Sequence, residues 1–297
     1  NGAEPIRPDT LRRFAEAFAP CGLRQEALTP VYGLAESTLL VSANAYTQET
    51  TGGSRSLVVS KQALSENAVQ PTTTATDMIE LVSTGRAASG ESHVVIVDPI
   101  SLTQQPEDSV GEIWVSGPSV AQGYWNRPEE SQQMFHSRVV GQDMSYLRTG
   151  DLGFLHNHEL YVTGRMKDMM ILNGGNIYPQ DIEATVERID PVFRTNGCAA
   201  FSVEHDGRAQ LVIIQEVESR STVQVETFIH QLRGELIEQH GIFEVSAVLL
   251  IKAGGLPRTS SGKIQRSRCR ELYSSEQFTP IWQWKQEDTY PVHCEQA

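Results

Sequence analysis

The sequence has few of the residues that hold small secreted or metal-stapled folds together. Only four of its 297 residues are cysteines, namely Cys21, Cys198, Cys269 and Cys294. They are far apart and none belongs to a Cys-x-x-Cys pair, which disfavours both a zinc site and a disulfide framework. We therefore expect a protein of a reducing compartment, the cytoplasm.

Long apolar runs and an excess of positive charge are also missing. No run of about 18 apolar residues occurs, so no transmembrane segment is predicted. With 24 basic and 37 acidic residues the formal net charge is −13. Nucleic acid is therefore not expected as a partner, because its phosphates need a basic surface. The chain shows no signal-peptide pattern, but it starts at Asn1 rather than at Met, so its targeting stays open.

The hydrophobic residues, 39% of the total, are enough for a core, and their spacing predicts the first elements. A helix is expected over 8–19, where Leu11, Phe14, Ala15 and Phe18 fall on one face. The stretch 42–77 is rich in Thr, Ser, Gln and Gly, and we expect an insertion with weak structure of its own. Short β-branched or aromatic runs predict strands at 93–98, 112–116 and 159–163.

The pattern changes after residues 166–176, whose closing Gly174-Gly175 pair we interpret as a joint. We place a domain boundary near Asp168, with one domain over 1–167 and a smaller α+β domain over 168–297. The second domain is predicted to contain helices at 181–189 and from Val225 to Gly241, and strands at 198–203, 210–217 and 245–251. An Asp206-Gly207 pair predicts the turn between its first two strands.

Lys263 lies in a Pro- and Gly-containing polar segment, Leu256 to Lys263 (LPRTSSGK). A lysine on such a loop can present a compact positive charge to a phosphate or carboxylate oxygen. A Walker A loop is excluded, because Pro257 stands where its first Gly should be and Ile264 follows the lysine. Taken alone, the segment fits an exposed surface turn better, because short motifs have high false-positive rates.

Tyr32 and Glu36 belong to a second segment of interest, YGLAES. An aromatic ring followed by Gly offers a flat face for a base and a close backbone approach to a ligand. The Glu36 carboxylate is a ligand that suits Mg²⁺. The alternative is a strand end with a core tyrosine and a solvated glutamate.

Two further charged segments follow. Asp151, in RTGDLG, is expected at a turn, where its carboxylate could accept hydrogen bonds from both hydroxyls of a ribose. Arg165 and Asp168, in GRMKD, are candidates for a ribose or phosphate contact and for a hinge. Ordinary aspartate turns and a charged hairpin exit explain the same residues. The opening NGAEP is a weaker signal, with small residues that leave room for a flat base.

Together and in this order, these segments resemble the adenylate-forming superfamily of acyl-CoA synthetases, peptide-synthetase adenylation domains and luciferases. The closer resemblance is to fatty acyl-AMP ligases. It is carried by NGAEP, YGLAEST, GEIWVSGPSVAQGYWNRPEE, YLRTGDLG with ELYVTGRMKDMMILNGGNIYPQDIE, and LPRTSSGKIQR. It extends over nearly the whole chain, apart from the insertion and the tail after about Ser275.

The resemblance implies a role for each matching residue. Gly2, Ala3 and Glu4 would line the adenine pocket, Tyr32 would stack on adenine, and Gly33 and Leu34 would complete the nucleotide site. Glu36 would bind Mg²⁺, Asp151 the ribose hydroxyls, and Arg165 the ribose and phosphate side. Asp168 would be the hinge of a mobile small domain. Lys263 would be the catalytic lysine that bridges the α-phosphate and the acyl carboxylate.

The implied fold is the β-rich end of the large α/β domain, followed by a small α+β domain. The implied reaction uses ATP to convert a fatty acid into acyl-AMP, and then passes the acyl group to the phosphopantetheine of an acyl carrier protein. This is chemistry of lipid, polyketide or nonribosomal peptide biosynthesis. No TSGSTG-type phosphate loop precedes Tyr32, so we expect the N-terminal half of the enzyme to be missing. An acyl-CoA synthetase and a non-enzymatic nucleotide-binding module remain as alternatives.

Overall fold

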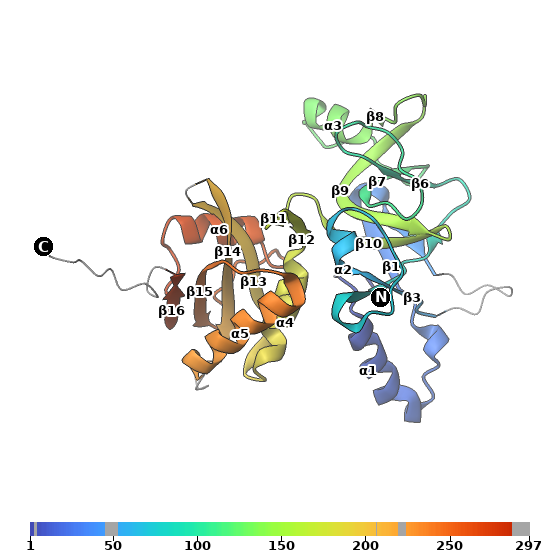
Figure 1. The fold of residues 1–297 in the computed structure, drawn as a ribbon. Coiled ribbons are helices and arrows are strands. Elements are labelled where there is room, and N and C mark those ends of the chain that lie inside the picture. The colour runs from blue at the N-terminus through green and yellow to red at the C-terminus, as the bar shows by residue number, and fades with distance from the viewer. Residues whose placement is uncertain (3–4, 45–52, 206, 219–223, 287–297) are drawn as a thin grey trace, which may run out of the picture. The chain divides into compact units, whose positions relative to one another are not determined.

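In the computed structural model, the described residues are 1–2, 5–44, 53–205, 207–218 and 224–286. Contacts within the chain divide it into two compact units, Asn1–Lys167 and Asp168–Ala297. Both units mix helix and strand, which confirms the predicted α/β and α+β class (Figure 1). Within the described residues, no helix is long and apolar enough to cross a bilayer.

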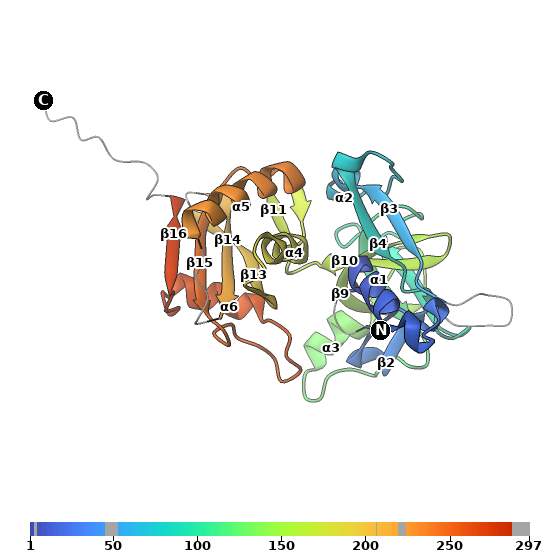
Figure 2. The ribbon, with the colours of Figure 1, turned by 90° about the horizontal axis from the view of Figure 1, so that it is seen from below.

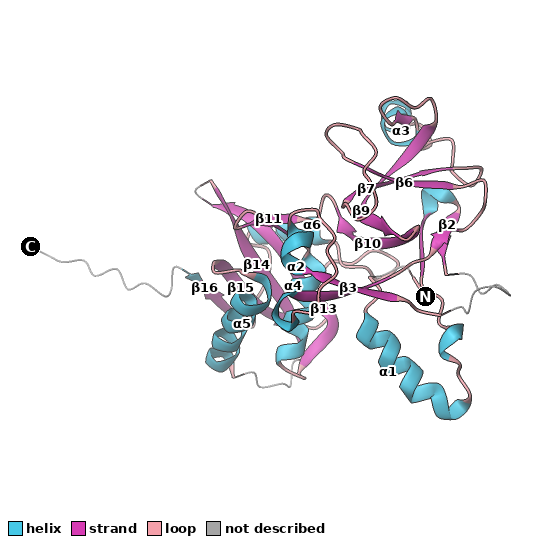
Figure 3. Cartoon of the chain, turned by 45° about the vertical axis from the view of Figure 1, so that its right-hand side comes forward, coloured by secondary structure: helices cyan, strands magenta, loops and turns pink. Residues whose placement is uncertain are grey.

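The first unit is built from antiparallel sheets. Its largest sheet has the order β10-β9-β7-β6 (Figure 3). The strand β8 also pairs with β9, and a smaller sheet has the order β1-β2-β5. A third sheet is the β3-β4 pair. The strands are β1 (Val31–Leu34), β2 (Leu39–Ala43), β3 (Ser56–Ser60), β4 (Met78–Val82), β5 (Arg86–Ala87), β6 (His93–Val97), β7 (Gly111–Ser116), β8 (Ser137–Arg138), β9 (Ser145–His156) and β10 (Glu159–Arg165); the α-helices are α1 (Pro8–Phe18), α2 (Lys61–Ser65) and α3 (Pro128–Phe135).

The β1-β2 hairpin packs against the larger sheet through alternate residues of β7. Ile113 and Val115 point into one apolar cluster, which also contains Tyr32 and Val41. Trp114 lies between them in sequence and joins a second cluster with Tyr146, as the two-residue period of a strand requires. The cluster around Ile113 thereby fixes β1 against the large sheet.

The second unit contains a two-stranded sheet, β11-β12, and a separate four-stranded sheet covered by helices on both faces (Figure 2). Its order is β13-β14-β15-β16, in which β14 and β15 are parallel and the other pairs are antiparallel. The helix α5 makes the crossover that a parallel pair needs. The elements are β11 (Met170–Leu172), β12 (Gly175–Ile177), α4 (Pro179–Ile189), β13 (Phe193–His205), β14 (Arg208–Val217), α5 (Val225–His240), β15 (Val245–Lys252), α6 (Arg266–Ser274) and β16 (Trp282–Lys285).

Alternation along β14 separates two cores. Leu211 and Ile213 face α4 and α5 in one apolar cluster, whereas Val212 and Ile214 belong to a second cluster with Cys269 of α6. A strand buried on both faces appears in the sequence as a continuous apolar run, which explains why residues 211–214 (LVII) predicted a strand.

The predicted elements are confirmed in kind, with shifted ends. α1 begins at Pro8 and ends at Phe18, and α5 ends at His240 with Gly241 in the left-handed conformation that favours glycine. Every predicted strand is present, and β13 is longer than expected. The predicted Asp206-Gly207 turn lies partly outside the described residues. The α3, β9, α6 and β16 elements were not predicted.

The expectation of weak structure over 42–77 is wrong for its described part. β3 pairs with β4, Val59 is fully buried, and Ser60 caps α2 by accepting a hydrogen bond from the Ala63 amide. Asp77 accepts from the Ser60 hydroxyl at 2.6 Å. The polar residues of this segment cap and connect elements rather than preventing them, which composition alone cannot distinguish.

The Gly174-Gly175 joint is also corrected. Asn173 and Gly174 have φ of 52° and 82° and form the two-residue turn of the β11-β12 hairpin, because a tight hairpin of this kind needs positive φ at both positions. At the other end of the unit, Trp282 and Trp284 lie on β16 and pack against the core shared with α5. The segment that carries these two tryptophans, Trp282–Lys285, is therefore an edge strand of the sheet.

Candidate functional site

Asp151 lies between two of the other predicted nucleotide-binding residues. The Tyr32 hydroxyl donates to Asp151 Oδ2 at 2.7 Å, and Arg165 Nε lies 3.2 Å from Asp151 Oδ1. Arg165 is the cross-strand neighbour of Asp151 in the β9-β10 pair. The fold therefore assembles an aromatic residue, a carboxylate and a guanidinium from three separate sequence segments.

Asp151 lies inside β9, so the expected turn at RTGD is wrong. Gly150 interrupts the strand with φ of 70°, which a glycine adopts without a steric cost. The Gly150 carbonyl accepts from the Met166 amide at 2.9 Å, and the Asp151 amide donates to Thr149 Oγ1 at 3.1 Å. A local kink in a paired strand thus orients the Asp151 carboxylate more firmly than an exposed turn would.

Glu112 of β7 holds this kink by accepting a hydrogen bond from the Gly150 amide. The sequence patterns did not predict a role for this residue. It is 1% exposed, and one carboxylate oxygen accepts from Arg148 Nε at 3.0 Å and Nη2 at 2.7 Å. The other oxygen accepts from the Gly150 amide at 3.1 Å. A glutamate beginning an apolar strand (EIWV) was the available signal, since a buried carboxylate needs a partner.

Tyr32 is only 9% exposed and packs in the core. Burial, followed by the negative charge of Asp151, raises the pKa of the Tyr32 hydroxyl well above its usual value. The hydroxyl is therefore a neutral donor to Asp151 at physiological pH. In the described structure Tyr32 fits the core-tyrosine alternative and orients Asp151, while its stacking on a base stays a prediction.

Gly33 is explained by the hairpin that contains it. A Cβ at this position would lie 1.6 Å from the Leu39 carbonyl oxygen, so no side chain can be accommodated. The space beside Gly33 is filled by the β2 backbone, and Leu34, the next residue of β1, packs half-buried against the Tyr32 cluster. The requirement for glycine here has a structural cause that is independent of any ligand.

Glu36 follows β1 in a short 3₁₀ turn, Ala35–Ser37. Its Oε1 accepts from the Tyr124 hydroxyl at 2.8 Å; burial and this hydrogen bond raise the pKa of Tyr124 to about 12. The described residues contain no group of three His, Cys, Asp or Glu side chains that could hold a metal. A single carboxylate fits Mg²⁺ that is shared with phosphate oxygens and water, not a cage made of protein ligands.

Of the opening residues, Ala3 and Glu4 lie outside the described part of the chain. Gly2 is described, and a Cβ there would lie 2.8 Å from Val31 Cγ2 and 2.9 Å from the Val31 carbonyl oxygen. The Val31 amide in turn donates to the Asn1 carbonyl at 2.8 Å. Gly2 is therefore adjacent to the strand that carries Tyr32.

Lys263 lies in the second unit, on a turn that several hydrogen bonds close. The Thr259 amide donates to the Lys263 carbonyl at 2.8 Å, and the Gly262 amide donates to the Thr259 carbonyl at 2.9 Å. The Lys263 amide donates to Thr259 Oγ1 at 3.1 Å. Gly262 has φ of 89°, which explains the glycine before the lysine. The turn that the sequence predicted is present, and its backbone is well fixed.

Asp168, the expected hinge, is the first residue of the second unit. Its Oδ2 lies 3.5 Å from Arg266 Nη1, and Arg266 also donates to both oxygens of Glu183, at 2.7 and 2.6 Å. Burial lowers the pKa of Arg266, but the hydrogen bonds and charge of Glu183 outweigh it and raise that pKa overall. Asp168 is thus linked through Arg266 to the segment that carries Lys263.

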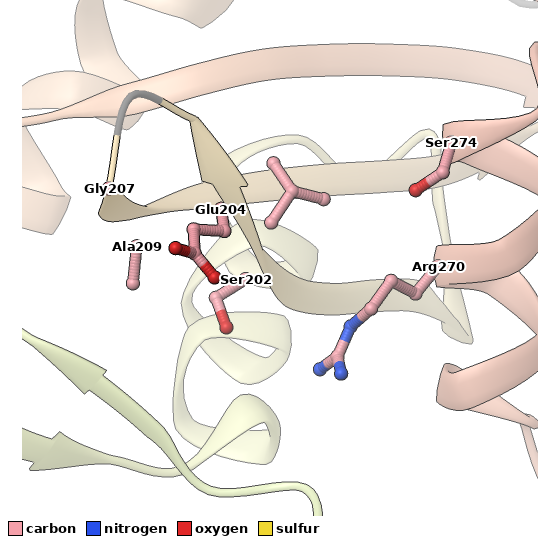
Figure 4. Close-up of a pocket in the computed structure, with 7 residues that line it drawn as sticks. Ser202, Glu204, Gly207, Ala209, Arg270 and Ser274 are labelled. Atoms are coloured by element: carbon pink, nitrogen blue, oxygen red, sulfur yellow. The ribbon is translucent and has the colours of Figure 1, made fainter.

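A hollow of about 550 Å³ lies elsewhere on the second unit (Figure 4). Ser202 and Glu204 of β13 and Arg270 and Ser274 of α6 line it. None of the residues predicted to act on a nucleotide is among them. Tyr32, Asp151 and Arg165 of the first unit and Lys263 of the second therefore stay the candidate residues, and this hollow is not among the predicted features.

Comparisons with known proteins find similar sequences for both parts of the chain. A family model described as AMP-binding enzyme matches residues 1–125, and one described as the AMP domain of Disco-interacting protein 2-like proteins matches residues 167–283. The medium-chain-fatty-acid–[acyl-carrier-protein] ligase JamA of Moorena producens is 43% identical over 275 residues, which are 91% of this chain and 46% of JamA. A Mycobacterium tuberculosis protein named as a fatty-acid–CoA ligase is 38% identical over 298 residues, with coverages of 95% and 48%.

Among solved structures, one from a study of fatty acyl-adenylate ligases of E. coli and L. pneumophila has a TM-score of 0.80 and 29% identity. It covers 93% of this chain and 47% of that one. The fold is thus that of the adenylate-forming enzymes. Within that class, the chain is similar to proteins named as fatty acid–AMP or acyl-adenylate ligases, and it spans about half the length of the curated relatives it matches.

Proposed function

We propose that the protein containing this chain uses ATP to activate a fatty acid as acyl-AMP, with release of pyrophosphate. The observation that carries the proposal is the Asp151 carboxylate held between the Tyr32 hydroxyl and Arg165. Its oxygens are oriented before a ligand arrives and can accept hydrogen bonds from the two hydroxyls of a ribose. Arg165 has a side chain that is 53% exposed, which leaves the guanidinium accessible to a phosphate.

The reaction joins two anions at one phosphorus atom. A fatty carboxylate attacks the α-phosphorus of ATP, a bond to the α-phosphate forms, and pyrophosphate leaves. Positive charge from Lys263 offsets the repulsion and the charge that develops in the transition state. Mg²⁺ held by Glu36 and the phosphates would supply further charge when bound. Asp151 and Arg165 fix the nucleotide so that attack is in line.

The acyl acceptor in this proposal is the phosphopantetheine of an acyl carrier protein, as the name of JamA states for that relative. The name of the mycobacterial relative supports a second candidate, formation of acyl-CoA. The two are separated by supplying the full-length protein with ATP and fatty acid, and then either coenzyme A or a loaded carrier protein. Efficient acyl-CoA formation by the intact enzyme would overturn the carrier-protein assignment. Location in the cytoplasm, expected from the cysteines, remains part of the proposal.

Lys263→Ala in the full-length protein tests the chemical step. Losing one preorganised charge should lower pyrophosphate exchange into ATP by roughly 10²-fold or more. Lys252→Ala is the matched control, because Lys252 is an exposed lysine at the end of β15 in the same unit. Near-normal exchange by the Lys263 variant would show that another residue supplies the charge.

A further inference from the structure

Glu216, at the end of β14, is a fully buried carboxylate beside the Lys263 turn. It is 0% exposed, and its Oε1 accepts from the Leu256 amide at 2.9 Å. Its Oε2 lies 3.3 Å from Arg258 Nη2. An ionised carboxylate without partners would be expensive to bury. These two contacts, together with Arg194 Nη1 at 3.9 Å from Oε2, account for its presence in the core.

Arg258 links this buried carboxylate to the Lys263 turn and to the neighbouring strand β13. Its Nη1 donates to the Gly262 carbonyl at 3.0 Å, next to Lys263. Its Nη2 donates to the Asn196 carbonyl of β13 at 2.7 Å. The planar guanidinium has donors in a fixed fork, so one side chain holds the turn and the neighbouring strand together. A lysine has a single ammonium and cannot reproduce this geometry.

The segment from Leu256 to Gln265 is closed as a unit around Arg258. Arg258 and Ile264 form a β-bridge, and the Gln265 amide donates to the Pro257 carbonyl at 3.0 Å. Leu256 is 4% exposed and packs in the core on the α6 side. The backbone of Lys263 is therefore tied to the sheet through Arg258 and Glu216, while its side chain is only partly covered.

We propose that Glu216 and Arg258 are positioning residues that fix the Lys263 turn for catalysis. This inference rests on the catalytic role proposed for Lys263. A buried ion pair is rarely the most stabilising solution for a core, and a hydrophobic pair of similar volume often packs as well. The Glu216–Arg258 pair matters here because it fixes the position of Lys263, and a misplacement of a catalytic group by about 1 Å can lower the rate by about 10²-fold.

The test uses Arg258→Lys in the full-length enzyme, with pyrophosphate exchange measured over a range of ATP concentrations. The kcat should fall at least 10-fold, while the KM for ATP stays within about twofold because the nucleotide residues belong to the other unit. Glu216→Gln should give a smaller fall in kcat, because it keeps an acceptor for the Leu256 amide but loses the charge. Arg268→Lys is the control, since Arg268 forms an exposed pair with Glu271 on α6.

A double-mutant cycle separates positioning from general damage. In a Lys263→Ala background, Arg258→Lys should change the residual rate by less than about twofold, because a turn cannot position a side chain that is gone. An equal fall in both backgrounds would overturn the inference. If Arg258→Lys does not fold, Thr259→Ala replaces it. Thr259 is exposed and its hydroxyl accepts from the Lys263 amide, so the same loss of effect is expected.

The two proposals fail in different ways. A Lys263→Ala variant with the expected loss of rate, combined with a fully active Arg258→Lys, would overturn the positioning role alone. A fully active Lys263→Ala would overturn the catalytic role of Lys263, and the positioning role with it.

Discussion

The Tyr32 hydroxyl donates a 2.7 Å hydrogen bond to Asp151 across 119 residues of sequence. It joins β1 of the small sheet to β9 of the large sheet, and it leaves Asp151 with one oxygen facing Tyr32 and the other facing Arg165. A residue expected to act through its ring thus contacts a second predicted site residue through its hydroxyl.

Tyr32→Phe separates these two roles. The ring remains, but the hydrogen bond to a charged acceptor is lost, which is worth about 1.5–3 kcal/mol. We expect ATP binding by the full-length protein to weaken by about 10-fold or more, measured by calorimetry. Tyr146→Phe is the control, because the Tyr146 hydroxyl contacts Gln142 away from Asp151. Unchanged binding in Tyr32→Phe would mean that the hydroxyl does not orient Asp151 for the ribose.

Glu112→Gln should destabilise the first unit and weaken nucleotide binding together. Loss of the charge weakens the hydrogen bonds from Arg148, whose side chain is 26% exposed, and a hydrogen bond to a charged group contributes about 1.5–3 kcal/mol. Denaturant midpoints and ATP affinity would be measured on the same samples. Glu130→Gln should change neither by much, because its pair with Arg127 is exposed on both sides. Normal affinity at reduced stability would show that Glu112 supports the fold but not the site.

Gly33→Ala should prevent the β1-β2 hairpin from closing. The added methyl group would lie 1.6 Å from the Leu39 carbonyl oxygen, so one of the two strands must move. We expect low yields of folded protein and a lowered melting temperature even without nucleotide. Gly234→Ala is the matched control: nothing lies within 4 Å of a Cβ there, and an alanine inside α5 should stabilise by about 0.5–1 kcal/mol. A stable Gly33→Ala protein with only its ATP binding lost would point instead to a ligand contact.

Asp77 should make the stability of the segment 56–82 depend on pH. The Ser60 hydroxyl, followed by the Gln62 amide, lowers the pKa of Asp77 in the folded state. Its stabilising effect is therefore complete above the unfolded pKa of about 3.9 and disappears as the pH falls through the lower folded value. The difference in denaturant midpoint between the wild type and Asp77→Ala should be present at pH 6 and shrink below about pH 4.

The control for this experiment is Asp143→Ala, at an exposed loop position, for which the difference should be small throughout. A difference for Asp77→Ala that grows as the pH falls would contradict the assignment, because it would require a raised folded pKa.

Local sequence patterns were sufficient to predict elements whose residues contact near neighbours in the sequence or are buried in a continuous apolar run. The period of α1, the apolar runs of β14 and β15 and the glycine that ends α5 are all visible in the sequence. The structure of the polar segment 42–77 could not be predicted in this way. Ser60 and Asp77 form a hydrogen bond across 17 positions, and serine and aspartate are also common in loops.

The order of the motifs identified the family and nominated Tyr32, Asp151, Arg165 and Lys263. Only the tertiary structure decided how these residues are held. It placed Arg165 opposite Asp151 on neighbouring strands, and it buried Tyr32 with its hydroxyl toward Asp151. It also placed two buried carboxylates: Glu112 accepts from the Gly150 amide, and Glu216 contacts Arg258 of the Lys263 turn. The physical reason is that a buried carboxylate needs hydrogen-bond donors, and these donors come from residues far away in the sequence. Local sequence patterns do not predict which distant donors will lie beside it.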